Sequence, residues 1–278
     1  MKFGTFFFPT AYAIDVVDLA KELEDRGFES LFLCEHTHIP VSRETPFPGG
    51  GELPEKYAHT HDPFVALSFA AAATRNLTLG TGISLITQRD PIVTAKAAAS
   101  LDLLSGGRFV LGAGGGWNLE EMRNHGTDPK TRFKVLEERL KAMKALWTED
   151  EAEFHGDFVD FDPVWSFPKP ATRPHPPILI GGETDHTIRR VVEFADGWLP
   201  RANYNFDPAA GMARLKQAAD AAERPMSTLS VTVFRATPEP AHVAACREAG
   251  IDRVLFDVPD KGRDEVLTLL DDYAKLMG

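Results

Sequence analysis

The sequence predicts a single α/β domain over residues 1–278, folded as an eight-stranded (β/α)8 TIM barrel. Short apolar runs rich in β-forming residues alternate with longer helical patterns, and eight such runs are present. This alternation indicates a parallel sheet, because parallel neighbours need crossover connections. Eight units favour closure into a barrel. A doubly wound open sheet is the alternative, but its G-x-G-x-x-G marker is absent after the first run.

The individual elements follow from apolar periodicity and from glycine and proline punctuation. The first helix, expected over 14–26, carries an apolar stripe and stops at Gly27, which suits a left-handed helix cap. The eight strands are expected at residues 2–8, 30–34, 77–84, 109–112, 177–180, 197–199, 230–234 and 253–257. The later helices are expected at residues 63–74, 91–104, 117–124, 130–147, 184–195, 208–222, 239–248 and from about 263 onward.

Two insertions interrupt this regular order. Residues 35–60 are polar and rich in glycine and proline, and they are too long for a structureless connection without a function. Residues 151–175 carry aromatics, prolines and a small hairpin near Gly156. We expect both insertions to shape a substrate pocket. Aromatic residues that could line it, with packing as their alternative role, are Phe47, Trp117 and Trp165.

Composition limits the partners. The chain is 43% hydrophobic and 26% charged, which is ordinary for a soluble globular protein. Its net charge of −11 argues against a nucleic-acid partner, because phosphate binding needs a basic field. No run approaches the roughly 18 apolar residues of a membrane span. Two cysteines, Cys34 and Cys246, do not suggest a disulfide framework, so we expect a cytoplasmic protein with both thiols buried.

Candidate site residues cluster where the predicted strands end, which is where barrel enzymes carry their chemistry. Glu35 and His36 follow the second strand. The loop after the fourth strand, residues 112–118, is mostly glycine, so its backbone can approach a large flat ligand. After the fifth strand, a Gly-Gly pair at 181–182 opens directly into a helix, an arrangement that suits a phosphate. Tight turns that need a positive φ are the structural alternative for both glycine motifs.

These motifs resemble the luciferase-like flavin and deazaflavin oxidoreductase family over nearly the whole chain. The motifs that carry the resemblance are Gly80-Thr81-Gly82-Ile83, Leu104-Ser105-Gly106-Gly107-Arg108-Phe109, Leu111 to Asn118 with Glu120-Glu121, Gly181-Gly182 with Thr184, and Ala195-Asp196-Gly197-Trp198. The chain looks most like the subgroup that uses the deazaflavin coenzyme F420, and FMN-dependent monooxygenases are close relatives of that subgroup. The resemblance implies hydride transfer between F420 and a small organic substrate, in a homodimeric enzyme.

The resemblance also implies roles for particular residues. Glu35 and His36 would face the coenzyme ring and the substrate as the catalytic pair, and histidine suits proton transfer because its ordinary pKa lies near neutrality. The peptide between Gly82 and Ile83 would be cis, behind the ring. Residues implied to contact the coenzyme are Glu35, Gly82, Ile83, Gly114, Gly115, Asn118, Gly181, Gly182 and Thr184. Sugar-phosphate-oxidising relatives carry a catalytic glutamate at the position of Gly115, so this chain lacks the acid of that reaction.

Other readings stay open from the sequence. Arg89 could meet an anionic tail of the coenzyme or pair with Asp90, and Glu183 is expected to point outward, away from a bound anion. His36 could instead be a hydrogen-bonded structural histidine. A metal-dependent hydrolase is suggested by two His-x-His pairs, at 36–38 and 59–61, with Glu183 and Asp257 as further ligands. The main interpretation includes no metal. A member that binds flavin without catalysis is the last alternative.

Overall fold

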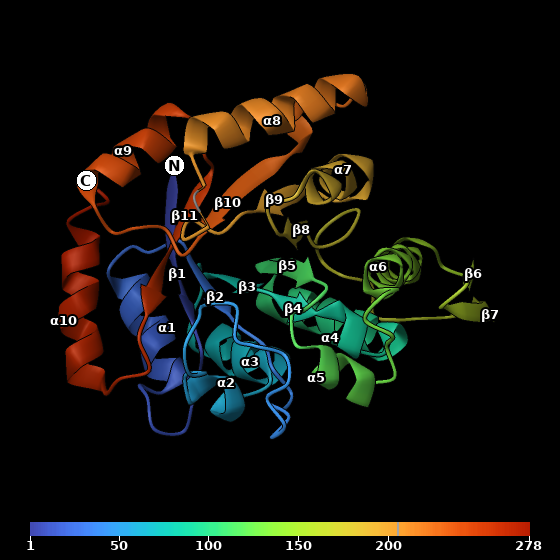
Figure 1. The fold of residues 1–278 in the computed structure, drawn as a ribbon, viewed down its shortest axis with the longest axis horizontal. Helices are drawn as coiled ribbons and strands as arrows, with labels where there is room; N and C mark the ends of the chain where they lie inside the picture. The colour runs from blue at the N-terminus through green and yellow to red at the C-terminus, as the bar shows by residue number, and fades with distance from the viewer. Residues whose placement is uncertain (205) are drawn as a thin grey trace.

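Eight parallel strands close into a barrel in the computed structural model, which describes residues 1–204 and 206–278 (Figure 1). Each strand pairs with parallel neighbours on both sides, and β1 joins β2 to β11, so no edge is left open. The predicted barrel is confirmed. The barrel strands are β1 (Lys2–Phe7), β2 (Ser30–Leu33), β3 (Thr78–Thr81), β5 (Phe109–Gly114), β8 (Ile178–Gly181), β9 (Gly197–Leu199), β10 (Ser230–Phe234) and β11 (Arg253–Val258).

Helices surround the barrel and lie within about two residues of their predicted bounds. Four begin at aspartates, Asp15, Asp62, Asp90 and Asp207, whose side chains accept hydrogen bonds from the unpaired N–H groups of the first turn. The outer helices are α1 (Val16–Asp25), α3 (Pro63–Ala73), α4 (Pro91–Ser105), α6 (Arg132–Thr148), α7 (Asp185–Phe194), α8 (Pro208–Ala221), α9 (Pro240–Glu248) and α10 (Arg263–Ala274). Short elements in connections are α2 (Lys56–His59), α5 (Leu119–Asn124), η1 (Ile86–Gln88) and η2 (Met226–Thr228).

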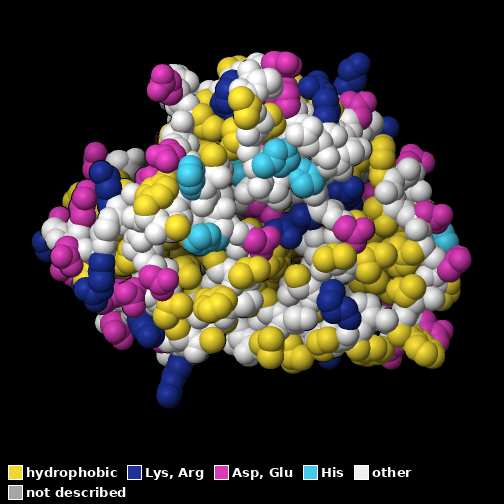
Figure 2. Space-filling view, turned by 90° about the horizontal axis from the view of Figure 1, so that it is seen from below, with side chains coloured by type: hydrophobic (Ala, Val, Ile, Leu, Met, Phe, Trp, Pro, Cys, Tyr) yellow, Lys and Arg dark blue, Asp and Glu magenta, His cyan; other side chains and the backbone are white. Residues whose placement is uncertain are grey.

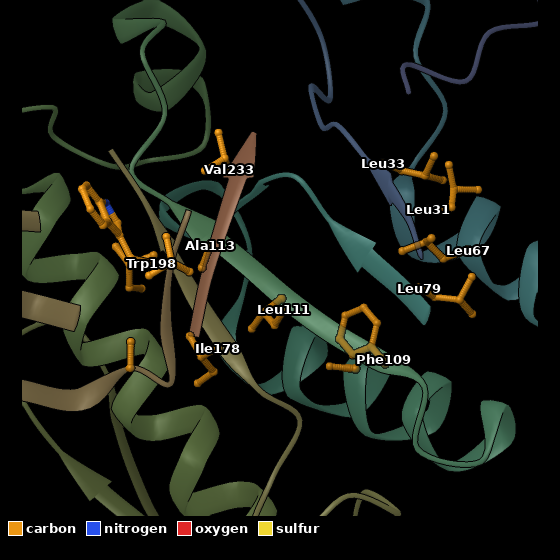
Figure 3. Packing of buried hydrophobic residues seen from close by; sticks show 14 of the residues in the cluster. Leu31, Leu33, Leu67, Leu79, Phe109, Leu111, Ala113, Ile178, Trp198 and Val233 are labelled. Atoms are coloured by element: carbon orange, nitrogen blue, oxygen red, sulfur yellow. The ribbon is translucent and has the colours of Figure 1, made fainter. Parts of the chain in front are cut away.

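The main hydrophobic core fills the space between the strands and the helices. Figure 3 shows Leu31 and Leu33 of β2, Leu79 of β3 and Leu67 of α3 together on one side of this layer. Alternate residues of the same strands point inward instead, because successive side chains of a strand face opposite ways. The inward residues form a second, smaller cluster: Phe6, Phe8, Phe32, Cys34, Val110, Leu179, Leu199 and Leu255.

The third predicted strand is divided in two. The structure places β3 before Gly82 and a short β4 (Ser84–Leu85) after Ile83, and both segments pair with β5. The prediction of one unbroken strand over 77–84 is therefore wrong. The ladder is interrupted at the Gly82–Ile83 peptide, which is cis, as the family resemblance predicts.

The insertion at 151–175 lies outside the barrel. Its hairpin, β6 (Ala152–His155) and β7 (Asp160–Val164), extends beyond α6 in Figure 1, and Glu138 of α6 accepts hydrogen bonds from its turn. Farther on, Thr172 binds Asp102 of α4 near the amino ends of the strands. The insertion is bonded to the outer helices α4 and α6, and its predicted part in shaping the substrate pocket stays a prediction.

Both cysteines are buried and unpaired, as predicted. Along residues 1–204 and 206–278, no helix combines the length and the apolar character needed to cross a membrane.

Candidate active site at the carboxyl ends of the strands

His36 lies at the carboxyl end of β2, in the mouth of the barrel. Its ring is 8% exposed and has a partner at each nitrogen. Nδ1 lies 2.8 Å from Oε2 of Glu121 on α5, and the indole N–H of Trp117 points to Nε2 at 3.3 Å. Figure 2 views the molecule from this side and shows histidine side chains gathered around a hollow that contains charged groups.

Glu35 lies beside His36 in the sequence but points to the opposite side of the chain. One carboxylate oxygen accepts hydrogen bonds from the Ser84 hydroxyl at 2.8 Å and from the Leu85 N–H at 2.6 Å. The other oxygen binds Arg89. The Glu35 side chain is 1% exposed, and both of its oxygens are engaged by the protein. This geometry favours a positioning role, and its assignment as a catalytic group stays a prediction.

Arg89 pairs with carboxylates other than the predicted Asp90. Its guanidinium joins Glu35 to Asp62, whose side chain also caps α3. Burial opposes the charge, but these two carboxylates outweigh it and raise the pKa of Arg89. The predicted Asp90 pair is wrong because Asp90 instead caps α4. Because Arg89 binds both carboxylates, it connects the start of α3 to the loop after β4.

Aromatic rings surround His36. Tyr57 lies 5.4 Å from the imidazole between ring centroids, and Trp117 lies 5.7 Å away at a steep angle. Phe47 contacts both of these rings from the 35–60 insertion. Burial raises the pKa of Tyr57 to about 12, so its hydroxyl stays protonated at neutral pH. The structure places Phe47 and Trp117 in the group of rings around His36, and their role in lining a substrate pocket stays a prediction.

Trp165 was predicted to join these aromatics, and that prediction is wrong. It lies just after β7 at the outer hairpin, is 78% exposed, and bonds to Glu151. Its distance from the strand ends follows from the position of the whole insertion outside α6.

Glycines open the half of the mouth formed by β3, β5 and β8. A Cβ on Gly114 would meet the side chain of Ile83 at 2.1 Å, and one on Gly181 would meet it at 3.2 Å. Ile83 can therefore lie flat across both strands only because these positions lack side chains. Ile83 remains partly exposed, so it presents an apolar floor beside the histidine.

Asn118 and Gln88 lie against the loop that follows β5, which is the predicted fourth strand. The Asn118 side chain caps α5 by accepting from the N–H of Glu121, and it is 1% exposed. Gln88 is 6% exposed, and neither atom of its amide finds a protein partner among the described residues. Its nitrogen lies 3.4 Å from the place where a Cβ on Gly116 would be. A buried amide normally has partners, so Gln88 offers a free donor and acceptor beside the loop.

The α7 amino terminus follows the Gly181-Gly182 turn. Gly182 has φ of 124°, and a Cβ there would also lie 2.8 Å from the Thr187 hydroxyl, so only glycine suits the turn. Thr184 caps the helix. Glu183 was predicted to point outward, and that prediction is wrong. Its carboxylate accepts hydrogen bonds from the side chain and the N–H of Arg201. That pairing removes its charge from the turn.

A cleft between α6 and α7 is lined by Phe133 and Arg190 among others, and two guanidinium groups without carboxylate partners pack on this phenylalanine ring. Arg132 and Arg190 both stack on Phe133, with their central carbons 4.5 and 4.6 Å from the ring centroid. Among the described residues, the Nε atom of each is buried without a partner, and neither forms an ion pair. A Cβ on Gly115 would meet Phe133 at 3.1 Å, so the cleft adjoins the loop after β5. Burial lowers the pKa of Arg190, which indicates a desolvated charge.

The histidines proposed as metal ligands do not converge on one site, since His36 contacts Glu121 whereas His59 contacts Glu55. His38 binds Thr37 and Asn124, and His59 lies on α2 beside Glu55. In the described parts of the chain, no group of three or more His, Cys, Asp or Glu side chains is arranged to hold a metal ion.

Sequence reasoning missed Glu121, Tyr57, Arg132 and Arg190 as site residues. Asn118-x-x-Glu121 has the spacing of a helix capping box, which could have directed attention to the acid. No local signal distinguishes Arg190 from the exposed Arg189 next to it, because only tertiary packing buries one of them.

The fold and the site together define a barrel protein with an apolar, glycine-lined mouth beside a histidine. The family model described as luciferase-like monooxygenase matches residues 1–253, and the chain belongs to this family, whose members are oxidoreductases. The chain is 36% identical to an uncharacterized protein of Mycobacterium tuberculosis over 280 residues, covering 99% of this chain and 98% of that protein.

Two further relatives differ in coenzyme. The F420-dependent glucose-6-phosphate dehydrogenase of Amycolatopsis mediterranei is 27% identical over 227 residues, 79% of this chain and 63% of that enzyme. The FMNH(2)-dependent dimethylsulfone monooxygenase of Pseudomonas putida is 38% identical over 97 residues, 34% of this chain and 27% of that enzyme. The family therefore contains users of both coenzymes.

Solved structures show the same fold at low identity. The monooxygenase RslO1 from Streptomyces bottropensis superposes with a TM-score of 0.80 at 20% identity, covering 100% of this chain and 98% of that one. An F420-dependent secondary alcohol dehydrogenase, in complex with an F420-acetone adduct, gives 0.78 at 16% identity, covering 99% and 97%. At these identities the likeness concerns the fold alone.

Proposed function

We propose that this protein is an F420-dependent oxidoreductase that transfers a hydride between the coenzyme and a small organic substrate. The observation that carries the proposal is the floor formed by Ile83 over Gly114 and Gly181. This floor follows β3, which pairs with β2, the strand whose carboxyl end carries His36. A flat ring system needs such an apolar surface, with a proton-transfer group near its reacting edge. The F420-dependent relative supports the choice of coenzyme.

The residues present suit both ends of a deazaflavin. We assign the ring to Gly82, Ile83 and the 114–118 loop, where the free amide of Gln88 could pair with its polar edge. We assign the anionic end to the Gly181-Gly182 turn and to the cleft that contains Arg190. Helix N–H groups and unpaired guanidinium groups both favour phosphate and carboxylate.

The protein's own chemistry is positioning and proton transfer. When bound, a deazaflavin supplies a ring carbon that accepts or donates the hydride. His36 takes up or returns the accompanying proton at Nε2, the nitrogen that faces Trp117. Phe47, Tyr57 and Trp117 keep water away from that nitrogen. Glu35 holds Arg89 and the loop after β4, and so fixes the site from behind.

The second candidate is an FMN-dependent monooxygenase. The local likeness to the FMNH(2)-dependent enzyme favours it, and the same apolar floor would accept an isoalloxazine ring. The two candidates are tested by titrating the purified apoprotein with F420 and with FMN, using the fluorescence of each coenzyme. We expect saturable binding of F420 and weaker binding of FMN. Binding of FMN alone would overturn the proposal. A screen of alcohols and enones with the bound coenzyme then identifies the substrate class.

We further propose a homodimer. Helices α3 and α4 are adjacent and expose large apolar side chains on one face: Val65, Phe69, Val93 and Leu104, which are 58 to 84% exposed. Exposed apolar faces of this kind mark interaction surfaces. Light scattering after gel filtration should give the mass of two chains, and Phe69→Glu should give the mass of one. A monomeric wild-type protein would contradict the proposal.

A further inference from the structure

The two partners of His36 specify one protonation pattern of its neutral ring. Indole N–H groups can only donate, so Nε2 must accept from Trp117 with its lone pair. An ionised carboxylate can only accept, so Nδ1 must carry the hydrogen that points to Glu121. The contact from Trp117, in the loop after β5, and the contact from Glu121, on α5, therefore assign the same tautomer independently.

Glu121 is an unusual carboxylate. Its side chain is 0% exposed, and its second oxygen accepts the N–H of Thr37 at 3.2 Å. Among residues 1–204 and 206–278, no lysine or arginine forms an ion pair with it, so His36 is its one basic partner. A buried carboxylate without a cation is costly, and it favours the positive form of any imidazole bonded to it.

The position of Glu121 does not follow from its sequence pattern. In a capping box the acid three residues after the cap would bond back to the N–H of Asn118. Here the acid reaches His36 and Thr37 on the second strand's loop instead. The loop after β5 has no acid, because Gly115 stands where sugar-phosphate-oxidising relatives carry a glutamate. The carboxylate beside the histidine comes from α5.

We propose that Glu121 is the positioning residue that holds His36 with its hydrogen on Nδ1 and its lone pair on Nε2. A proton that arrives at Nε2 forms an imidazolium, and the Glu121 carboxylate at 2.8 Å offsets its charge. Trp117 occupies Nε2 until a substrate oxygen replaces the indole N–H. The role in turnover rests on the proposed function, whereas the tautomer assignment concerns this chain alone.

The test is nitrogen-15 NMR of the imidazole signals in protein without coenzyme or substrate. His36 is assigned among nine histidines by the signals lost in His36→Ala. In the wild-type protein above the ring's titration, we expect a protonated Nδ1 and a bare Nε2. Glu121→Ala should mix the two tautomers and bring the two nitrogen shifts together. Glu121→Gln, which keeps the volume, should also mix the tautomers, because an amide can donate to Nδ1 as well as accept from it.

Glu120→Gln is the matched control. Glu120 lies on the same turn of α5 and carries the same charge, but it binds Thr45 and does not touch His36. The His36 imidazole signals of Glu120→Gln should equal those of the wild-type protein. If Glu121→Gln and Glu121→Ala leave the His36 signals and their pH midpoint unchanged, the inference is wrong.

The pH profile of turnover separates this inference from the proposed function. With a working substrate, Glu121→Gln should lower turnover and move the profile, whereas coenzyme affinity should stay within about twofold. If F420 fails to bind the wild-type protein, the proposed function fails while the NMR result still decides the role of Glu121. If F420 binds and the NMR signals do not change in the variants, only the positioning role fails.

Discussion

The two ends of the barrel use charged side chains in opposite ways. At the amino end, Arg253 forms a two-point contact with Glu29, at 2.7 Å for each nitrogen, and Lys2 joins the same carboxylate at 3.1 Å. Arg108 donates to four backbone carbonyls and to the Thr74 hydroxyl after α3. A cavity of about 610 Å³ lies here, but Glu29, Arg108 and Arg253 of its lining are already bonded within the protein.

At the carboxyl end, comparable groups are left without protein partners. In the described residues, Arg190 has a buried Nε without an acceptor, and Asp257 has a buried oxygen without a donor. Burial raises the pKa of Asp257 despite the nearby Lys56 and Arg235. The difference teaches that cavity size is a weaker guide to a site than unsatisfied polar atoms. The amino end stabilises the barrel, and we expect the carboxyl end to bind the ligands.

The largest effect should come from removing His36. His36→Ala should reduce turnover roughly 10²–10⁴-fold, the usual contribution of a general acid or base, because no other side chain offers a lone pair at that point. Steady-state kinetics with a substrate from the screen measure this effect. His38→Ala, two residues farther along, should retain most activity, because His38 binds only Thr37 and Asn124. Unchanged turnover in His36→Ala would contradict the catalytic assignment.

The next effect concerns the unpaired guanidinium. Arg190→Gln should weaken coenzyme binding about 10- to 100-fold, since a hydrogen bond to a charged group is worth about 1.5–3 kcal/mol. Arg247→Gln is the control, because Arg247 lies on α9 beside the amino-end cavity and does not line this cleft. Fluorescence titration measures both variants. Equal affinities would remove Arg190 from the coenzyme site and weaken the contrast between the barrel ends.

At the amino end the expected effect is on stability. Burial opposes ionisation of Glu29, but Arg253 and Lys2 lower its pKa from 4.5 to about 2. Glu29→Gln should therefore reduce the free energy of unfolding by about 2 kcal/mol at neutral pH, allowing for partial solvent screening. Because the folded pKa is the lower one, this stabilisation is present above pH 4.5 and is lost as the pH falls toward 2.

Urea unfolding at pH 7 and at pH 4 tests this sign. The difference between Glu29→Gln and the wild-type protein should shrink at the lower pH, and coenzyme affinity should not change. A variant that loses coenzyme binding while keeping its stability would reverse the roles assigned to the two ends.

The smallest effect should come from the outer hairpin. Trp165→Ala should change the free energy of unfolding by no more than about 0.5 kcal/mol, because the ring is mostly exposed. Turnover should also stay unchanged, whereas Trp117→Ala should reduce it by uncovering His36. A loss of activity in Trp165→Ala would indicate that the 151–175 insertion takes part in the substrate pocket.

Glu35 shows how far the sequence could lead. Its place beside His36 suggested a catalytic pair, but successive residues of an extended chain point to opposite sides. Cys34 belongs to the inward cluster, so His36 follows it inward, while Glu35 turns toward Ser84 and Arg89. That separation was available from the alternation alone. Its partners were not, because they come from residues about 50 positions away.

The sequence by itself determined the barrel and the glycine-lined loops, because strand and helix periodicity and turn chemistry are local properties. The end at which the barrel works stays a prediction. Only the tertiary structure decided which charges are bonded and which remain free. Glu121 reaches His36 across 85 residues, and Arg190 is buried while Arg189 is not. Such pairings depend on how distant helices pack, and no local pattern of residues specifies them.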